Sequence, residues 1–330
     1  MKHISRRALP PLLAGLVLLS VLLALCAGSV TLPLRETARA LLAGDADSLF
    51  YRVFVHVRLP RVLAALSAGM ALSVSGVLLQ GVFHNVLAGP NIIGVNAGAG
   101  FAVMLTVTLL PRSALSVPAA GFLGALGAAL LIYLIASLSG ADNVTVVLTG
   151  VAVASLLTAG MDALRTLFPD SIADASAFLI GSFGGASMER LFPAVWLILA
   201  GLAAALLTGR RLDVLALGDD AAASLGMDVG RARFFFLLIA ALLAGAAVSF
   251  AGLLGFVGLL VPHAVRRFTG HSHALLLPCA ALAGGSFVVL CDLLGRVLFA
   301  PYELPAGVLL SALGAPFFLS LLLKRRGTNP

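Results

Sequence analysis

The sequence predicts an all-α, polytopic membrane protein with about ten transmembrane helices. Hydrophobic residues make up 61% of the 330 residues and charged residues only 11%, whereas charged residues are about a quarter of an ordinary soluble domain. A soluble core could not bury so much apolar surface. The apolar runs are about 20 residues long, which suits helices that cross a hydrocarbon core of about 30 Å. The ten-residue alternation of a membrane β-barrel is not present in the sequence.

Ten apolar segments are the expected helices. They lie at residues 8–31, 62–82, 92–110, 117–137, 144–167, 192–209, 233–254, 256–268, 274–296 and 305–323. The eighth is short and contains Pro262, so we expect it to be bent or to span only part of the membrane. The first could be a cleavable signal peptide, but its length favours a retained helix. Residues 1–330 are therefore expected to form a single transmembrane domain.

The basic residues at the two ends of the chain predict its orientation. Ten crossings place both termini on one side, and each terminus carries a basic cluster: Lys2, Arg6 and Arg7, then Lys324, Arg325 and Arg326. Cytoplasmic segments of membrane proteins are enriched in such residues. We therefore expect both termini in the cytoplasm and lipid around the helices. This pattern also accounts for the net charge of +7, so no nucleic-acid partner is expected.

The longest polar interval on the predicted inner side is residues 212–233. It holds Asp213, Asp219, Asp220 and Asp228 among apolar residues, and basic residues flank it. Two glycines within it each end a short run, as glycine does where a helix stops. We expect two short helices joined by a glycine turn on the inner face of the membrane. Such a segment is either an ordinary loop or a docking element for another protein, and ordered leucines beside acidic residues favour docking.

The sequence lacks the common catalytic signatures. The only lysines are Lys2 and Lys324, so no lysine stands beside glycines as a phosphate-binding P-loop requires. No His-Glu-x-x-His or Gly-x-Ser-x-Gly pattern occurs. The three cysteines lie in apolar runs and predict no disulfide framework. We therefore expect a chain that is not an enzyme and that carries no metal or cofactor.

Several arginines fall on the predicted outer side. Arginine forms bidentate pairs with carboxylates, which suits a docking surface for an acidic partner. The alternative is local pairing with acids on the same side, namely Asp45, Asp47, Asp170 and Asp174. Near the outer end of the ninth segment, Asp292 lies four residues before Arg296, a spacing that also favours an ion pair within one helix.

Four groups of motifs go beyond composition. They are Arg58-Leu-Pro-Arg61; Gly76-Val-Leu-Leu-Gln80 with Asn85-Val-Leu-Ala-Gly-Pro90; Gly255-Phe-Val-Gly-Leu-Leu-Val-Pro-His-Ala-Val-Arg266 with Asp292-Leu-Leu-Gly-Arg296 and Glu303-Leu-Pro-Ala-Gly307; and Leu217-Gly-Asp-Asp-Ala-Ala-Ala-Ser-Leu-Gly226. Together they resemble the FecCD-type permease subunits of bacterial ABC importers for iron–siderophore complexes, haem and vitamin B12.

The resemblance implies an assembly with the fold of the vitamin B12 permease, a type II ABC importer. Two permease copies, identical or paralogous, would form a central pathway in the bacterial inner membrane. Two copies of a cytoplasmic ATPase would lie beneath them, and one periplasmic or lipid-anchored substrate-binding protein would dock outside. The cargo ranks as an iron complex first, then haem, then cobalamin.

The resemblance also implies roles for individual residues. Docking of the binding protein is expected at Arg58, Arg61 and Arg296. Coupling to the ATPase is expected at Leu217, Gly218, Asp219, Asp220, Ala223, Leu225 and Gly226, with Asp219 or Asp220 pairing to a basic residue of the ATPase. An inner gate is expected at Asn85 and Leu87. Here Val86 replaces the usual proline of the family, which frees the backbone of Asn85 from its usual restriction.

Two other classes of protein remain as alternatives. An ion-coupled secondary transporter also packs many apolar helices, often as repeats. A membrane scaffold without transport activity would not need motifs at both faces. Dependence of transport on ATP, and its resistance to ionophores, would separate the importer from the secondary transporter.

Overall fold

The computed structural model describes residues 8–28, 33–110, 116–138 and 143–326, and it is helical throughout with no strand in these ranges. The helices are α1 (Leu9–Cys26), α2 (Leu34–Ala43), α3 (Leu49–Val53), a π-helical turn (Phe54–Arg58), α4 (Leu59–Val82), α5 (Val95–Leu109), α6 (Ser116–Leu138), α7 (Asn143–Leu167), α8 (Ser171–Ile180), α9 (Met188–Leu215), α10 (Asp219–Ser224), α11 (Val229–Ala251), α12 (Val257–Thr269), α13 (His273–Val297) and α14 (Ala306–Arg326).

Each of the ten expected segments contains a helix. Seven helical stretches in the described residues are long and apolar enough to cross a membrane: α1, the continuous stretch Leu49–Val82, α6, a part of α7, α9, α11 and α13. The chain is therefore a multi-pass membrane protein, and the count of ten crossings stays a prediction. The eighth segment forms the 13-residue α12 with Pro262 inside it, which confirms that this segment is short.

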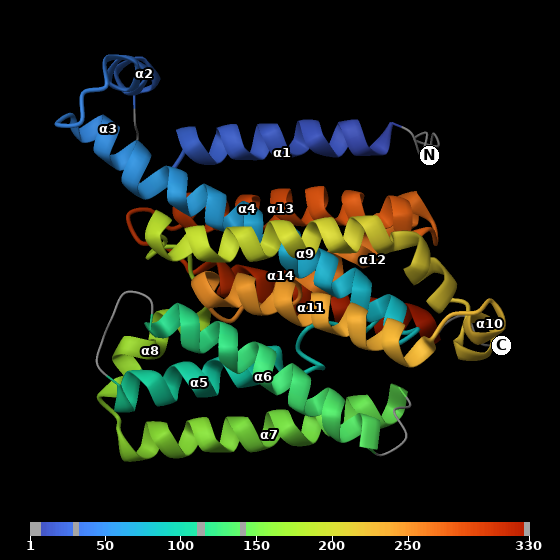
Figure 1. Ribbon diagram of the computed structural model, residues 1–330. Coiled ribbons are helices and arrows are strands. Elements are labelled where there is room, and N and C mark those ends of the chain that lie inside the picture. Colours follow the sequence, from blue (N-terminus) through green and yellow to red (C-terminus); the bar gives the residue numbers. More distant parts are fainter. Residues whose placement is uncertain (1–7, 29–32, 111–115, 139–142, 327–330) are drawn as a thin grey trace.

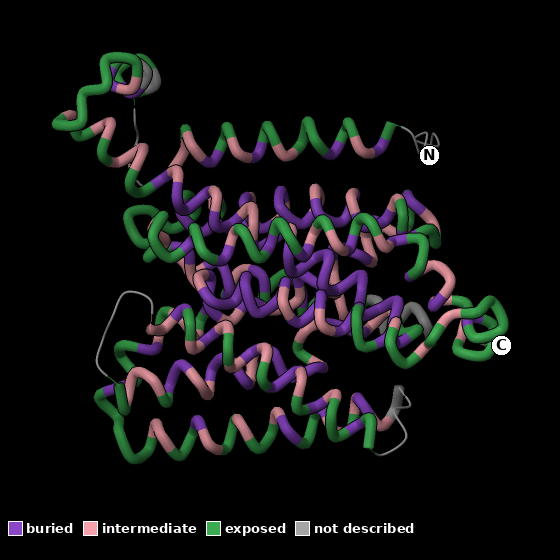
Figure 2. The backbone as a smooth tube through the Cα atoms, viewed as in Figure 1, coloured by how far each residue is buried: buried purple, intermediate pink, exposed green. Residues whose placement is uncertain are grey.

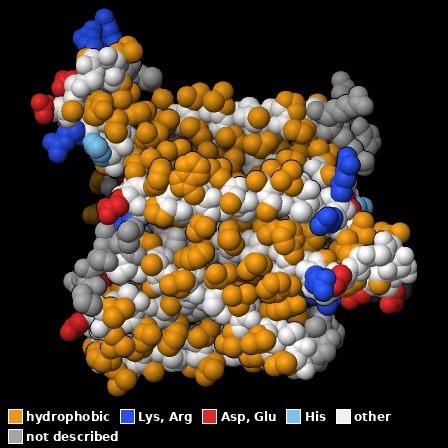
Figure 3. Space-filling model, viewed as in Figure 1, with side chains coloured by type: hydrophobic (Ala, Val, Ile, Leu, Met, Phe, Trp, Pro, Cys, Tyr) orange, Lys and Arg blue, Asp and Glu red, His pale blue; other side chains and the backbone are white. Residues whose placement is uncertain are grey.

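The long helices run side by side between two ends of the molecule (Figure 1). We name these ends by the short helices that lie there, the α10 end and the α2 end. Helix α1 begins and α14 ends near the α10 end, while α2, α3 and α8 lie at the other. Apolar side chains cover the flank between the ends, and charged side chains gather near the ends themselves (Figure 3). This distribution is what a lipid-embedded bundle requires.

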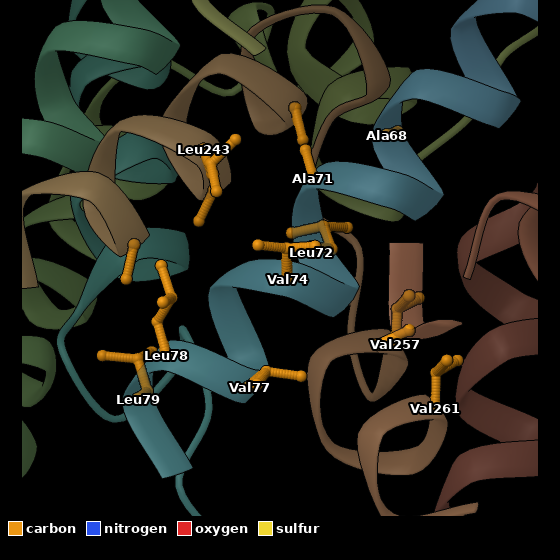
Figure 4. Close-up of a cluster of buried hydrophobic side chains, with 14 of the residues drawn as sticks. Ala68, Ala71, Leu72, Val74, Val77, Leu78, Leu79, Leu243, Val257 and Val261 are labelled. Atoms are coloured by element: carbon orange, nitrogen blue, oxygen red, sulfur yellow. The ribbon is translucent and has the colours of Figure 1, made fainter. Parts of the chain in front are cut away.

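Helix α4 lies at the centre of the bundle. It packs most extensively against α13 and α11, and also against α12 and α9, and it is buried along most of its length (Figure 2). Leu72, Val77 and Leu78 of α4 lie in one cluster with Leu243 of α11 and Val257 of α12 (Figure 4). A helix that is apolar on all sides either faces lipid or is surrounded by other helices, and the burial of α4 shows that it is surrounded.

Glycines bring α4 into backbone contact with two of its neighbours. Gly69 faces Gly284 of α13, and Gly76 faces Gly258 in the first turn of α12. A Cβ atom at Gly69 or Gly76 would overlap the backbone of the glycine opposite. Small residues allow this close packing, which membrane helices use in place of a hydrophobic driving force.

Candidate functional site

At the α2 end, the structure brings together the three arginines that the sequence analysis selected. Arg58 closes the π-helical turn, Arg61 lies in the first turn of α4, and Arg296 lies in the last turn of α13. Their exposed fractions are only 4%, 6% and 3%, and Asp292 beside them is 1% exposed. The four residues therefore form a buried charged cluster, which we call the arginine cluster.

Asp292 is the anion at the centre of the arginine cluster. Nε and Nη2 of Arg61 donate to its carboxylate at 3.0 to 3.1 Å, while Nη1 of Arg61 contacts Glu303 at 2.6 Å. Nε of Arg296 lies 3.1 Å from the same carboxylate of Asp292. The ion pair expected from the spacing of Asp292 and Arg296 is thus confirmed. Arg61 thus pairs with Asp292 and Glu303, and Arg296 pairs with Asp292, rather than with the four acids considered as local partners.

The arginine cluster also holds the end of α1. Nη1 of Arg58 donates to the carbonyl oxygens of Leu25 and Cys26, both at 2.7 Å. Arg296 donates to the carbonyl oxygens of Ala24 at 3.3 Å and Ala27 at 3.4 Å. The last carbonyls of a helix lack partners within the helix and carry the negative end of its dipole. The two guanidinium groups therefore cap α1 and tie it to α4 and α13.

Other arginines at the α2 end are exposed. Arg35 and Arg39 lie on α2, and Arg52 lies on α3. Sequence reasoning did not single them out, although α2 is an amphipathic helix whose pattern marks a surface element. A docking role for Arg58, Arg61 and Arg296 stays a prediction, and in this structure their side chains point inward.

At the α10 end, the polar interval contains one short helix rather than two. Residues 212–215 continue α9, and residues 229–233 open α11, so only the six residues of α10 remain between them. The expectation of two short helices was wrong because the apolar pattern of α9 runs on into the interval. The glycines do mark the turns, since Gly218 and Gly226 have φ values of 109° and 83°, which glycine tolerates best.

The α10 segment presents apolar side chains to its surroundings. Leu217 and Leu225 are 65% and 66% exposed, and Asp219, Asp220 and Ala223 are also exposed. Large apolar side chains exposed together beside acids at a charged end of the molecule favour an interaction surface. We call residues 217–226 the coupling segment. A recess of about 840 Å³ lies next to it, lined by Leu225, Gly226 and residues of α9 and α11.

Asp219 and Met227 make contacts within the chain. Asp219 pairs within the chain, since its carboxylate lies 2.7 Å from Nη2 of Arg233. The exposed Asp220 is therefore the better candidate for pairing with another protein. Met227, directly after the coupling segment, is partly buried and packs against the core.

The candidate gate residues lie in residues 83–94, which join α4 to α5 and which we call the gate loop. The side-chain oxygen of Asn85 accepts a hydrogen bond from the backbone N–H of Leu87 at 3.0 Å, a local turn typical of asparagine. Asn85 is exposed and Leu87 partly buried. A recess of about 520 Å³ separates this loop from the ends of α9 and α12 and the start of α13.

Polar contacts bind the helix ends around this recess. Nη2 of Arg266 donates to the side chain of Gln80 at 3.0 Å. The carboxylate of Asp213 accepts the backbone N–H of His273 at 2.7 Å and contacts its Nδ1 at 2.8 Å. The last turn of α9 therefore caps the start of α13, where helical N–H groups lack partners. Polar contacts thus join α4 to α12 and α9 to α13 beside the start of the coupling segment.

A helical bundle with apolar flanks, charged ends and one projecting segment is a multi-pass membrane protein. Residues 16–324 match the FecCD transport family. The chain therefore belongs to this family of ABC-importer permeases.

Individual relatives agree over nearly the full length. The chain is 36% identical over 327 residues to the Fe(3+)-citrate import system permease protein YfmE of Bacillus subtilis, covering 98% of both chains. It is 38% identical over 328 residues to the hemin transport system permease protein HmuU of Yersinia pestis, covering 97% of this chain and 98% of HmuU. A solved inward-facing metal-chelate type ABC transporter shares its fold with a TM-score of 0.84 and 28% identity, covering 97% of this chain and 100% of that one.

Proposed function

We propose that this chain is the permease subunit of an ABC importer that carries an iron complex across the bacterial inner membrane. Membership of the FecCD family supports a permease role, and the exposed leucines of the coupling segment support engagement of another protein at the α10 end. ATP hydrolysis would then be the work of a separate ATPase. The exposed coupling segment is the observation that carries this proposal.

The cargo is proposed from the relatives. One is named for ferric citrate and another for haem, so an iron chelate comes first and haem second. Cobalamin stays as the alternative within the same family.

The two ends of the molecule indicate where its partners would bind. We place the α10 end in the cytoplasm, together with both termini, because the terminal basic clusters predict that side. Two ATPase copies would bind there, one beneath this chain and one beneath a second permease copy. Leu217 and Leu225 would enter a cleft on the ATPase, each worth about 1.5–3 kcal/mol if fully buried. Gly218 and Gly226 would let α10 turn as a unit.

The α2 end would receive the substrate-binding protein. The exposed Arg35, Arg39 and Arg52 would make the first contacts with its acidic residues. The buried arginine cluster could engage a partner carboxylate only if that group displaced Glu303, which is 34% exposed at its side chain and occupies Arg61 in this structure. Glu303 would thus act as an internal stand-in for the partner.

Uptake into proteoliposomes tests the proposal. The permease would be reconstituted with its ATPase and binding protein, with ATP inside, and offered ⁵⁵Fe-citrate, haemin and cyanocobalamin separately. We expect uptake of an iron complex that requires ATP and survives ionophores. Uptake that ionophores abolish and that does not need ATP would instead establish the secondary transporter.

A further inference from the structure

Helix α4 ends in a motif that normally requires glycine. The backbone N–H of Asn85 donates to the carbonyl oxygen of Gln80 at 3.2 Å, and that of His84 donates to Gly81 at 3.4 Å. These are the two bonds of a Schellman motif, whose closing residue adopts the left-handed conformation and is usually glycine. Here the closing residue is His84, with a φ of 49°. A side chain at this position carries a steric penalty, so an imidazole there calls for an explanation.

The side chain of His84 reaches across to α9. Its Nε2 lies 2.8 Å from the carbonyl oxygen of Leu215, the last residue of α9. Because a carbonyl oxygen only accepts, Nε2 must be the donor. The same oxygen also accepts the backbone N–H of Gly218 at 3.2 Å. Gly218 is the residue that precedes α10. One oxygen atom therefore joins the end of α4 to the hinge of the coupling segment.

Residues 85–94 of the gate loop follow directly after this contact. The turn closed by Asn85 and Leu87 follows His84 in the chain. Leu87 and Pro90 of the loop then line a small cavity of about 100 Å³ together with Phe256 and Gly258 at the start of α12. A change in the backbone at His84 would therefore be passed along a short, folded loop to the centre of the bundle.

The surroundings of His84 leave it room to move. The recess of about 520 Å³ is lined by His84, Asn85 and Val86 on one side and by Leu217 of the coupling segment on another. By contrast, Gly81 of α4 packs closely against the side chain of Leu212 of α9. Helices α4 and α9 are thus packed together one turn before His84 and Leu215, whereas the residues that follow these helices can shift relative to one another.

We propose that His84 is a positioning residue that transmits displacement of the coupling segment to the gate loop through its hydrogen bond to Leu215. This inference rests on the proposed function. When the coupling segment turns about Gly218, the Gly218 N–H moves relative to the Leu215 carbonyl oxygen, which stays with α9. The bond between that shared oxygen and the imidazole changes in turn, and the backbone of the gate loop shifts at His84.

Variants at His84 separate this role from a structural one. His84→Gly and His84→Asn both suit a positive φ but cannot reach Leu215, so α4 should end normally and the protein should fold. His84→Gln keeps an N–H donor on a longer side chain. His271→Asn is the matched control, because His271 is an exposed histidine lining the same recess.

The measurement is substrate transported per ATP hydrolysed in the reconstituted complex, using whichever of ferric citrate, haemin and cyanocobalamin the wild type transports. We expect His84→Gly and His84→Asn to hydrolyse ATP but to transport about threefold to tenfold less per ATP, the factor that matches the loss of one neutral hydrogen bond. His84→Gln should recover part of the loss, and His271→Asn should match the wild type. An unchanged ratio in His84→Gly, or an equal loss in His271→Asn, would overturn the inference.

A second readout does not need a cargo. A fluorophore attached at Val86→Cys, in a chain whose three cysteines are replaced, should respond to ATP in the wild-type background and fail to respond with His84→Gly. If the wild type transported none of the three cargoes, the proposed function would fail, while this signal would still decide the role of His84. An equal ATP response with and without the imidazole would refute that role.

Discussion

Replacement of Asp292 by asparagine tests the arginine cluster directly. The change keeps the size of the side chain but removes the negative charge that Arg61 and Arg296 contact at 3.0 to 3.1 Å. Both guanidinium groups would stay buried, with Glu303 the carboxylate still in contact with Arg61. Removing one partner of a buried ion pair typically costs about 3–5 kcal/mol, because the remaining charge is left without compensation. That cost is a large share of the roughly 5–15 kcal/mol by which proteins are stable.

The chain supplies its own control for this prediction. Asp162 pairs with Arg165 at 3.0 Å in an i,i+3 arrangement, but the two side chains are 59% and 33% exposed. Exposed pairs of this kind contribute about 1 kcal/mol or less. Thermal unfolding of the purified protein in detergent should therefore show a much larger fall in Tm for Asp292→Asn than for Asp162→Asn. Equal Tm values for the two variants would refute the claim that burial makes the arginine cluster a structural clamp on α1.

Three further predictions follow from other parts of the structure. Leu225→Asp should leave insertion and folding intact but uncouple ATP hydrolysis from uptake, because it places a charge where an apolar side chain is proposed to enter the ATPase. Unchanged uptake in proteoliposomes would contradict this role of Leu225. Gly76→Ala should strongly reduce the yield of folded protein, since the Cβ of the alanine would overlap the backbone of Gly258. A normal yield and Tm would show that α4 and α12 can separate at no cost in stability. Arg35→Glu combined with Arg39→Glu should weaken binding of the substrate-binding protein more at low salt than at high salt, because salt screens exposed charges. An affinity that neither changes in this variant nor depends on salt would show that α2 is not part of the docking surface.

The positions of the long helices could be predicted because hydrophobic length alone specifies them. Each of the ten apolar segments contains a helix, and Pro262 correctly marked the short α12. The occurrence of Arg58, Arg61 and Arg296 at the same end of the molecule also followed from counting crossings, but their side-by-side placement did not. These features depend on local sequence and on the thickness of a membrane, both of which are visible before folding.

The contacts that define the sites could not be predicted in the same way. Arg61 and Asp292 are 231 positions apart, so nothing near either residue indicates that the arginine is buried and paired. The end of α9 could not be predicted correctly, because residues 212–215 continue its apolar helical pattern into the polar interval. His84 carries no sequence signal for a positive φ, since glycine or asparagine is the residue that usually marks such a position.

The side of the membrane on which the coupling segment lies is the point on which the whole account depends. Ser224 is the last residue of α10 and is exposed, so Ser224→Cys offers a conservative thiol at that site. Ala46, exposed between α2 and α3, gives a matching thiol at the opposite end as Ala46→Cys. Both would be made in a chain without Cys26, which is exposed, and without the buried Cys279 and Cys291.

A membrane-impermeant thiol reagent then decides the orientation. We expect Ser224→Cys to react in inside-out vesicles and not in intact spheroplasts, with the reverse result for Ala46→Cys. Labelling of Ser224→Cys from the outside of intact spheroplasts would contradict it, because no cytoplasmic ATPase could then reach the coupling segment.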